Sequence, residues 1–165
     1  MKIKFDGAKD FLIKIQSRKR EKTNSSFSVD NSRKNILNLK ILVCLDVSGS
    51  ISPEQFAQFM SQIDQIKGLS TVKIIETDSR VVAMYDHVVS HENKIARLKG
   101  GGGTEFSAAF DVAKKLNPDA ILFMTDGFVF DKVEDPGIPT GWVLTHDGFI
   151  PYEFGVIAAR LPQIQ

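Results

Sequence analysis

Residues 39–53 have the sequence LKILVCLDVSGSISP. The first half of this segment, residues 39–45, is a nearly continuous run of branched apolar residues, which is typical of a strand buried on both faces of a sheet. The run ends at Asp46 and a helix follows, in which Ser52 is the expected N-cap, Pro53 suits the first turn and Gln55 completes a capping box. A buried strand that leads directly into a helix predicts an α/β unit.

Apolar periodicity divides the rest of the chain into further strands and helices. Residues 72–77 and 81–85 are strand-like, and the short connection between them predicts an antiparallel hairpin. Residues 120–125 and 142–145 are expected strands, whereas for the apolar tail at 156–161 strand and helix stay open. A helix that follows the four glycines at 100–103 and ends at Asn117-Pro118 is expected to turn five residues inward: Phe106, Ala109, Phe110, Ala113 and Leu116. The pattern predicts a Rossmann-like, doubly wound α/β fold, with a mostly parallel sheet and one antiparallel edge hairpin.

The N-terminal part of the chain differs from the rest in charge. Residues 1–40 contain 11 Lys and Arg against 4 Asp and Glu, a net charge of +7, and residues 41–165 contain 10 against 16, a net charge of −6. Helical spacing of apolar residues predicts an amphipathic helix over residues 6–20, followed by a polar linker. We therefore divide the chain into a basic helix and linker at 1–35 and a domain at 36–165. We expect the helix to pack on or beside the acidic body, and nucleic-acid binding is the less favoured alternative.

The remaining composition favours a single cytoplasmic domain. A length of 165 residues suits one domain with a sizeable core. Cys44 is the sole cysteine, so no internal disulfide is possible, which fits a reducing compartment. The N-terminus lacks the apolar region of a secretory signal, and no apolar run approaches the length that spans a bilayer. We expect a cytoplasmic protein without a membrane segment.

Oxygen-bearing side chains follow the two most apolar strands. Asp46, Ser48 and Ser50 form D-x-S-x-S after the first, Asp126 follows the strand at 120–125, and Thr104 follows the glycine loop. Because the carboxyl ends of parallel strands meet at one sheet edge, where ligands of α/β sheets bind, these side chains are expected to converge. A set of oxygen ligands without His or Cys suits a hard cation, Mg²⁺ or Mn²⁺.

These motifs resemble the metal-ion-dependent adhesion site (MIDAS) of von Willebrand factor A-like (VWA-like) domains. Over roughly residues 36–161 the chain is similar to the bacterial VWA-like module of predicted metallopeptidase-like proteins, through LDVSGSIS at 45–52, GGGGTEF at 100–106, TDG at 125–127 and GWVLT at 141–145. The resemblance implies a VWA fold in which Ser48, Ser50 and Thr104 contact the metal directly, while Asp46 and Asp126 act mostly through bound water.

The same resemblance implies a metal-dependent protein-binding module. Neutral hydroxyl ligands leave the metal attractive to a carboxylate of a partner protein, and the family association points to a MoxR-type AAA+ ATPase or another protein-remodelling assembly. Relatives of the module usually follow a metallopeptidase-like region. Here His91-Glu92 is followed by Asn-Lys-Ile, so H-E-x-x-H is absent, and we expect no enzymatic activity.

Two other functions stay open as alternatives. The first is a haloacid-dehalogenase-like, metal-dependent phosphohydrolase, although Ser48 stands where that chemistry needs a second carboxylate. The second is a scaffold that works without a metal. We expect His87, His91 and His146 to be surface residues, Trp142 to be core, and the acidic side chains at 131–135 to be solvated. Phe128 and Phe130 flank Asp126 and are candidates for a binding rim.

Overall fold

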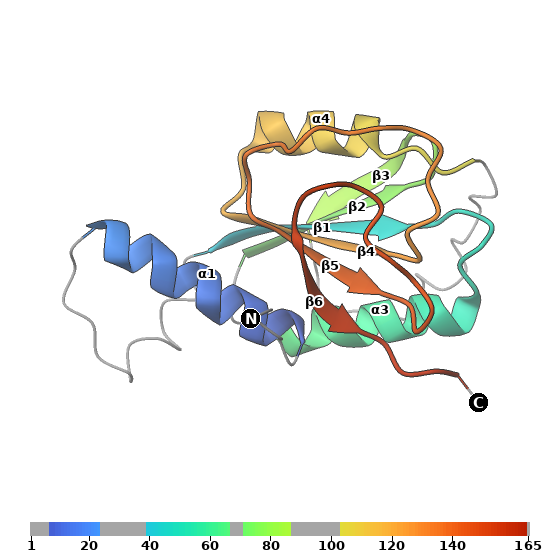
Figure 1. Cartoon of the computed structure of the whole chain (residues 1–165), viewed down its shortest axis with the longest axis horizontal. Helices are drawn as coiled ribbons and strands as arrows, with labels where there is room; N and C mark the ends of the chain where they lie inside the picture. The colour runs from blue at the N-terminus through green and yellow to red at the C-terminus, as the bar shows by residue number, and fades with distance from the viewer. Residues whose placement is uncertain (1–6, 24–38, 67–70, 87–102, 165) are drawn as a thin grey trace.

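The computed structural model describes residues 7–23, 39–66, 71–86 and 103–164. Figure 1 shows its helices and strands, which follow one another along the chain as α1 (Ala8–Thr23), β1 (Lys40–Asp46), α3 (Pro53–Ile66), β2 (Thr71–Thr77), β3 (Val81–Asp86), α4 (Ser107–Leu116), β4 (Ala120–Thr125), β5 (Thr140–Leu144) and β6 (Val156–Arg160). His87, His91, residues 100–102 and the expected linker from residue 24 onward lie outside the described residues, whereas residues 21–23 belong to α1.

Within the described residues the strands form one six-stranded sheet in the order β3-β2-β1-β4-β5-β6. Every neighbouring pair is parallel except β2 and β3, which form the predicted antiparallel hairpin at the edge. The apolar tail at 156–161, which the sequence left undecided between strand and helix, forms the strand β6, because it pairs with β5. The strand expected at 142–145 begins two residues earlier, at Thr140. The predicted fold class, a mostly parallel α/β sheet with one antiparallel pair, is confirmed.

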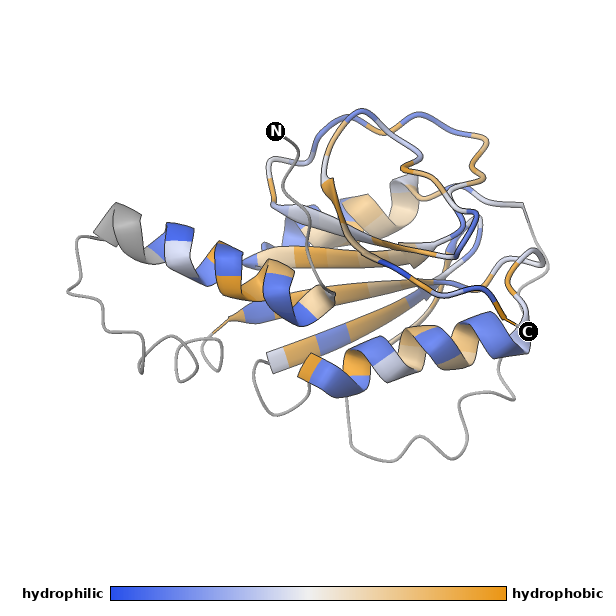
Figure 2. Ribbon diagram, turned by 60° about the horizontal axis from the view of Figure 1, so that its bottom comes forward, coloured by the Kyte–Doolittle hydropathy of each residue, from blue (hydrophilic) through white to orange (hydrophobic). Residues whose placement is uncertain are grey.

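Two helix layers enclose the sheet, with α4 on one face and α1 and α3 on the other (Figure 1). β1 buries six of its seven residues and β4 buries all six, as their continuous apolar sequences predict. Alternate residues of β1 point to opposite faces, so that Val43 and Leu45 join the core beneath α3, while Leu42 and Cys44 join the core beneath α4. Figure 2 shows the hydrophobic residues concentrated on the central strands between the helices.

Helix α3 begins as its sequence predicts. The backbone N–H of Ser52 donates to Oε1 of Gln55 at 3.0 Å, and the backbone N–H of Gln55 donates to Oγ of Ser52 at 3.1 Å, which is the reciprocal bonding of a capping box. Phe56, Phe59, Ile63 and Ile66 are buried against the sheet. The cap fixes the direction in which the chain leaves the 46–50 turn.

The prediction for α4 is correct at its end and wrong for one side chain. Asn117 ends the helix in the left-handed conformation, at φ 48°, and its N–H donates to the carbonyl of Ala113 at 2.9 Å. Leu116, which we expected to point inward, is 39% exposed. Helical periodicity gives the direction of a side chain, but it does not tell whether the sheet extends beneath the last turn.

The basic N-terminal helix packs against the acidic body. The apolar face of α1 (Ala8, Phe11, Leu12 and Ile15) is buried in the same core as α3. Lys19 forms an ion pair with Asp119 at 2.9 Å, and the other carboxylate oxygen of Asp119 accepts a bond from the backbone N–H of Lys40. The expected packing is confirmed, although the helix begins at Ala8 and extends to Thr23 instead of covering residues 6–20. The division at residue 35 stays a prediction.

Candidate metal centre

Asp46 joins the carboxyl ends of the two central strands. It is the last residue of β1 and is fully buried. Its Oδ1 accepts a bond from the backbone N–H of Ser48 at 2.9 Å, and its Oδ2 accepts a bond from the hydroxyl of Thr125, the last residue of β4, at 2.6 Å. The position of the carboxylate is therefore fixed by both strands.

The two predicted serines lie next to each other in the turn after β1. Their Oγ atoms are 3.2 Å apart; Ser48 is buried and Ser50 is exposed. The N–H of Ile51 donates to the carbonyl of Ser48 and closes this turn at 3.1 Å, and the N–H of Val47 bonds the end of β2 through the carbonyl of Thr77. Two hydroxyl oxygens are thus presented together at the edge of the sheet, beside the buried carboxylate.

Asp126 follows β4 in a tight turn that depends on a glycine. It is 5% exposed, and its Oδ1 accepts a bond from the N–H of Phe128 at 3.1 Å. Gly127 has φ +89°, and a Cβ at this position would lie 1.8 Å from the carbonyl oxygen of Phe149. Only glycine fits here, because the turn needs both the positive φ and the close backbone contact.

Thr104 and the residue after it are bonded to two of the neighbouring loops. It is 5% exposed, and its carbonyl accepts a bond from the N–H of Phe130, four residues after Asp126, at 2.9 Å. The N–H of the next residue, Glu105, donates to the carbonyl of Asp78 after β2 at 3.2 Å. The structure therefore brings the Thr104 segment to the edge at which β1 and β4 end. Whether the five side chains bind a metal stays a prediction.

Two acidic side chains, Asp46 and Asp126, lie close enough at this edge for their charges to interact. Burial raises the pKa of Asp46 to about 6, hydrogen bonds from Ser48 and Thr125 oppose that rise, and the charge of Asp126 adds to it. Among the described residues, no Lys or Arg forms an ion pair with either carboxylate. Such a pair of buried carboxylates is costly unless a positive charge compensates it.

The donor set fits a hard cation only if the hydroxyls take part. In the described part of the chain, no three His, Cys, Asp or Glu side chains come together as a metal site. The predicted set contains two carboxylates and three hydroxyls, and these are oxygen donors of the kind that Mg²⁺ and Mn²⁺ accept.

Asp131 has a structural role that its sequence did not reveal. The N-cap residue of α4 is Phe106, which has no side chain able to cap the helix. Oδ2 of Asp131 supplies the missing acceptor, because it accepts bonds from the backbone N–H groups of Phe106 and Ser107 and from the hydroxyl of Ser107. Its Oδ1 accepts a bond from Tyr152 at 2.7 Å. The expectation that this acidic residue is merely solvated is wrong. The uncapped start of α4 was the signal that a cap must come from elsewhere.

Partial burial of Asp131 disfavours its charged form. The hydrogen bonds from Ser107, Tyr152 and the backbone outweigh that effect and hold its pKa below the usual range. Burial and the bond to Asp131 raise the pKa of Tyr152 far above its ordinary value. Asp131 therefore acts as a charged cap at neutral pH.

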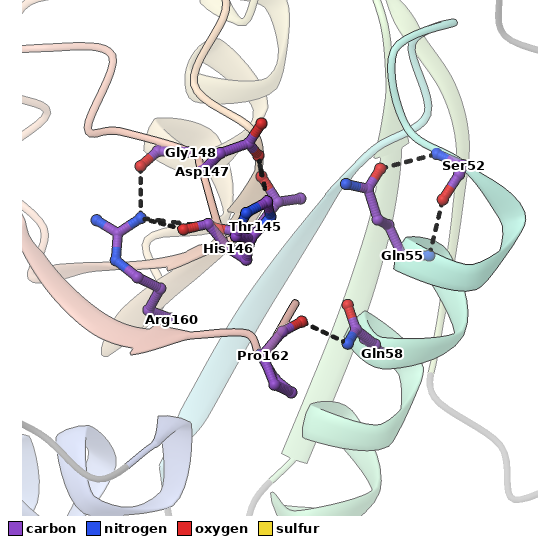
Figure 3. Close-up of polar contacts among 9 residues, drawn as sticks. All are labelled: Ser52, Gln55, Gln58, Thr145, His146, Asp147, Gly148, Arg160 and Pro162. Atoms are coloured by element: carbon purple, nitrogen blue, oxygen red, sulfur yellow. Dashed lines mark hydrogen bonds and ion pairs between the residues drawn. The ribbon is translucent and has the colours of Figure 1, made fainter. Parts of the chain in front are cut away.

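Arg160 supports the loop that packs on Asp126. Figure 3 shows its guanidinium, which donates through Nη1 to the carbonyls of Thr145, His146 and Gly148, the last at 2.6 Å. The loop in turn contacts Asp126, because the N–H of Phe149 donates to the Asp126 carbonyl at 3.1 Å. Nothing local in the sequence indicated this role, since the loop and β6 are separate segments.

A groove of about 300 Å³ lies between the first turns of α3 and the C-terminal segment. Gln58 crosses it by donating to the carbonyl of Pro162 at 3.0 Å (Figure 3). His146 lines the groove and is exposed, as expected.

Trp142 is fully buried and donates through Nε1 to the carbonyl of Phe154, which confirms that it is core.

Comparison with known proteins places the chain in a family. Residues 41–159, well over half of the chain, match the family model "VWA-like domain (DUF2201)". The chain belongs to this VWA-like family. No curated protein matches it. Among solved structures, an aerotolerance-related membrane protein from Bacteroides fragilis NCTC 9343 with multiple mutations to serines is 16% identical, with a TM-score of 0.45, over 65% of this chain and 67% of that one. The conserved hypothetical protein BatB from Bacteroides thetaiotaomicron is 15% identical, with a TM-score of 0.47, over 66% and 67%.

Family membership supports a general role for the VWA-like domain as a protein-interaction module. In the described part of the chain, no helix has the length and apolar character needed to cross a membrane.

Proposed function

We propose that this VWA-like domain is a metal-dependent protein-binding module. Ser48, Ser50 and Thr104 would hold Mg²⁺ or Mn²⁺, with Asp46 and Asp126 compensating its charge. The observation that carries the proposal is the buried Asp46 carboxylate, which lies near Asp126 and beside two serine hydroxyls 3.2 Å apart, and which has no ion-pair partner among the described Lys and Arg residues. When bound, the cation supplies an electrophilic centre for a carboxylate of a partner protein.

The hydrogen bonds of the site support binding over hydrolysis. A phosphohydrolase of the haloacid-dehalogenase kind needs the first aspartate as a nucleophile and a carboxylate two residues later as the acid/base. Here both Asp46 oxygens accept hydrogen bonds, and Ser48 occupies the later position. We therefore propose a role without catalysis.

Metal titration of the purified chain tests the proposal. A ligand that binds only the folded state adds about 2.7 kcal/mol of stability at 100 times its Kd. For a domain of this size, that raises Tm by about 5–10 °C. We expect this gain, together with a heat of binding, for Mg²⁺ or Mn²⁺, and we expect both to be lost in Ser48→Ala.

Ser61→Ala is the matched control, because Ser61 is an exposed hydroxyl on α3. It should bind metal as the wild type does. An absence of heat and of any melting shift in the wild type would contradict the proposal and leave the metal-free scaffold as the better description. An equal gain in wild type and Ser48→Ala would place the metal elsewhere.

The partner is a second and separable part of the proposal. The family resemblance points to a MoxR-type AAA+ ATPase that presents an acidic side chain to the metal. Pulldown with this chain from its native cell, with and without EDTA, tests that assignment. We expect the ATPase to be retained with metal and lost with EDTA or in Ser48→Ala. If an unrelated protein shows that pattern, the assignment of the partner is wrong while the metal-dependent role stands.

A further inference from the structure

Three large aromatic side chains are exposed beside the candidate metal centre. Phe128 is 54% exposed, Phe130 81% and Phe149 47%. The rings of Phe128 and Phe149 contact each other edge to face, with centroids 5.0 Å apart, although they come from the loops after β4 and β5. We call these three residues the aromatic rim. The fold does not need them exposed, because Phe110, Phe123 and Trp142 fill a separate, fully covered core.

Each residue of the rim is bonded through its backbone to the candidate metal centre. The N–H of Phe128 donates to the Asp126 carboxylate at 3.1 Å, the N–H of Phe149 to the Asp126 carbonyl at 3.1 Å, and the N–H of Phe130 to the Thr104 carbonyl at 2.9 Å. The distance from each aromatic residue to the metal centre is therefore set by the same hydrogen bonds that position Asp126 and Thr104.

Contacts of Arg160 and Gly127 also hold the loops that carry the rim. Arg160 holds the 145–148 loop through three carbonyls, and the contact of Gly127 with Phe149 closes the two loops together. Phenylalanine has only two side-chain torsions and therefore loses little conformational entropy when a partner covers it, and aromatic residues are enriched where proteins bind each other.

We propose that the aromatic rim binds a large apolar side chain that lies within one or two residues of the partner's metal-binding carboxylate. The inference rests on the proposed function and adds to it the chemistry of the partner: an extended segment of another protein in which a single Asp or Glu is next to Leu, Ile, Phe or Trp. Further acidic residues should be disfavoured there, since the loop after β5 carries the exposed carboxylate Asp147.

Selection from a phage library of random seven-residue peptides on the immobilised full chain tests the inference. In Mg²⁺ or Mn²⁺, we expect the wild type to enrich peptides with an acidic residue next to a large apolar one. Phe130→Ser with Phe149→Ser should still enrich acidic peptides but lose the apolar preference. A representative peptide should then bind about tenfold or more weakly to this double variant, because burial of one apolar side chain contributes about 1.5–3 kcal/mol.

Leu116→Ser is the matched control, since Leu116 is similarly exposed but lies at the far end of α4. It should keep the wild-type preference. Ser48→Ala should lose both preferences. Acidic enrichment without any apolar preference in the wild type would overturn the inference and leave the metal-dependent role intact. Apolar enrichment that persists in EDTA and in Ser48→Ala would overturn the link between rim and metal. No enrichment at all would count against both.

Two further measurements distinguish other occupants of the rim. Flotation with phosphatidylcholine–phosphatidylserine vesicles should show no binding. Binding lost in Phe130→Ser would make the rim a lipid-contacting surface and overturn the inference. Sedimentation should show the same oligomeric state for wild type and Phe130→Ser. Dissociation of a dimer by this substitution would assign the rim to a second copy of the chain and would also overturn it.

Discussion

Replacement of Asp131 by alanine should weaken the fold at the junction between the β4 loop and α4. Asp131 accepts two bonds from backbone N–H groups at the start of α4 and two from hydroxyl groups, those of Ser107 and Tyr152. Loss of a helix cap costs about 1 kcal/mol. A mostly buried Tyr152 hydroxyl left without its partner costs about 1 kcal/mol more. We use no larger values because the carboxylate is partly exposed and therefore screened by solvent.

The expected loss is thus about 2 kcal/mol at pH 7, which corresponds to a decrease in Tm of about 4–8 °C for a domain of this size. Urea unfolding followed by circular dichroism measures the free energy, and Glu134→Ala is the control because Glu134 is an exposed carboxylate of the same loop. The control should change stability by less than about 0.5 kcal/mol.

The dependence of stability on pH tests independently whether the charge of Asp131 stabilises the fold. Because the pKa of Asp131 is lower in the folded state, its charge contributes stability above the unfolded pKa, about 3.9, and that contribution is lost as pH falls through the folded value. The difference between wild type and Asp131→Ala should therefore be constant from pH 7 to about pH 5 and narrow below pH 4. Equal stability of the two proteins at pH 7, or a difference that grows on acidification, would refute the reasoning.

Three further predictions concern a glycine turn, a helix cap and a buried thiol. Gly127→Ala should lower the free energy of unfolding by about 3–5 kcal/mol, because the strain of a left-handed conformation adds to a backbone clash with Phe149. Gly137 also has a positive φ but open space around it, so Gly137→Ala should lower it by only about 1–2 kcal/mol. Urea unfolding of the two variants measures the difference. Ser52→Ala removes a cap of α3 and should cost about 1 kcal/mol in the same assay, and an unchanged midpoint would contradict the capping geometry. The thiol of Cys44 should not react with a thiol reagent in the native protein and should react on unfolding, because burial raises its pKa well above the usual range.

The parts of the fold that the sequence predicted correctly depend on local patterns. The continuous apolar runs of β1 and β4 identify strands buried on both faces, and the capping box at Ser52 and Gln55 marks the first turn of α3. Asp46 and Asp126 could be placed at one edge because parallel strands end on the same side of a sheet. In each case the information lies within a few residues of the feature.

The features that the sequence did not reveal depend on contacts between distant segments. Asp131 caps a helix that begins 24 residues before it, and Arg160 holds carbonyls 12 to 15 residues before it. The exposure of Leu116 depends on how far the sheet extends beneath α4. Local sequence patterns do not predict these contacts, because the contacts depend on how segments that are distant in the sequence pack against each other.

The two carboxylates of the candidate metal centre are held in place by the protein itself. Asp46 is held by Ser48 and Thr125, and the turn at Asp126 is held by the N–H of Phe128 and by the close contact of Gly127. These bonds fix the two carboxylates that would compensate the charge of a bound cation. The stability that such a cation adds should therefore be limited by its affinity for this set of oxygens. The backbone bonds to Asp126 also position Phe128 and Phe149, so the carboxylate and the aromatic rim are fixed relative to each other.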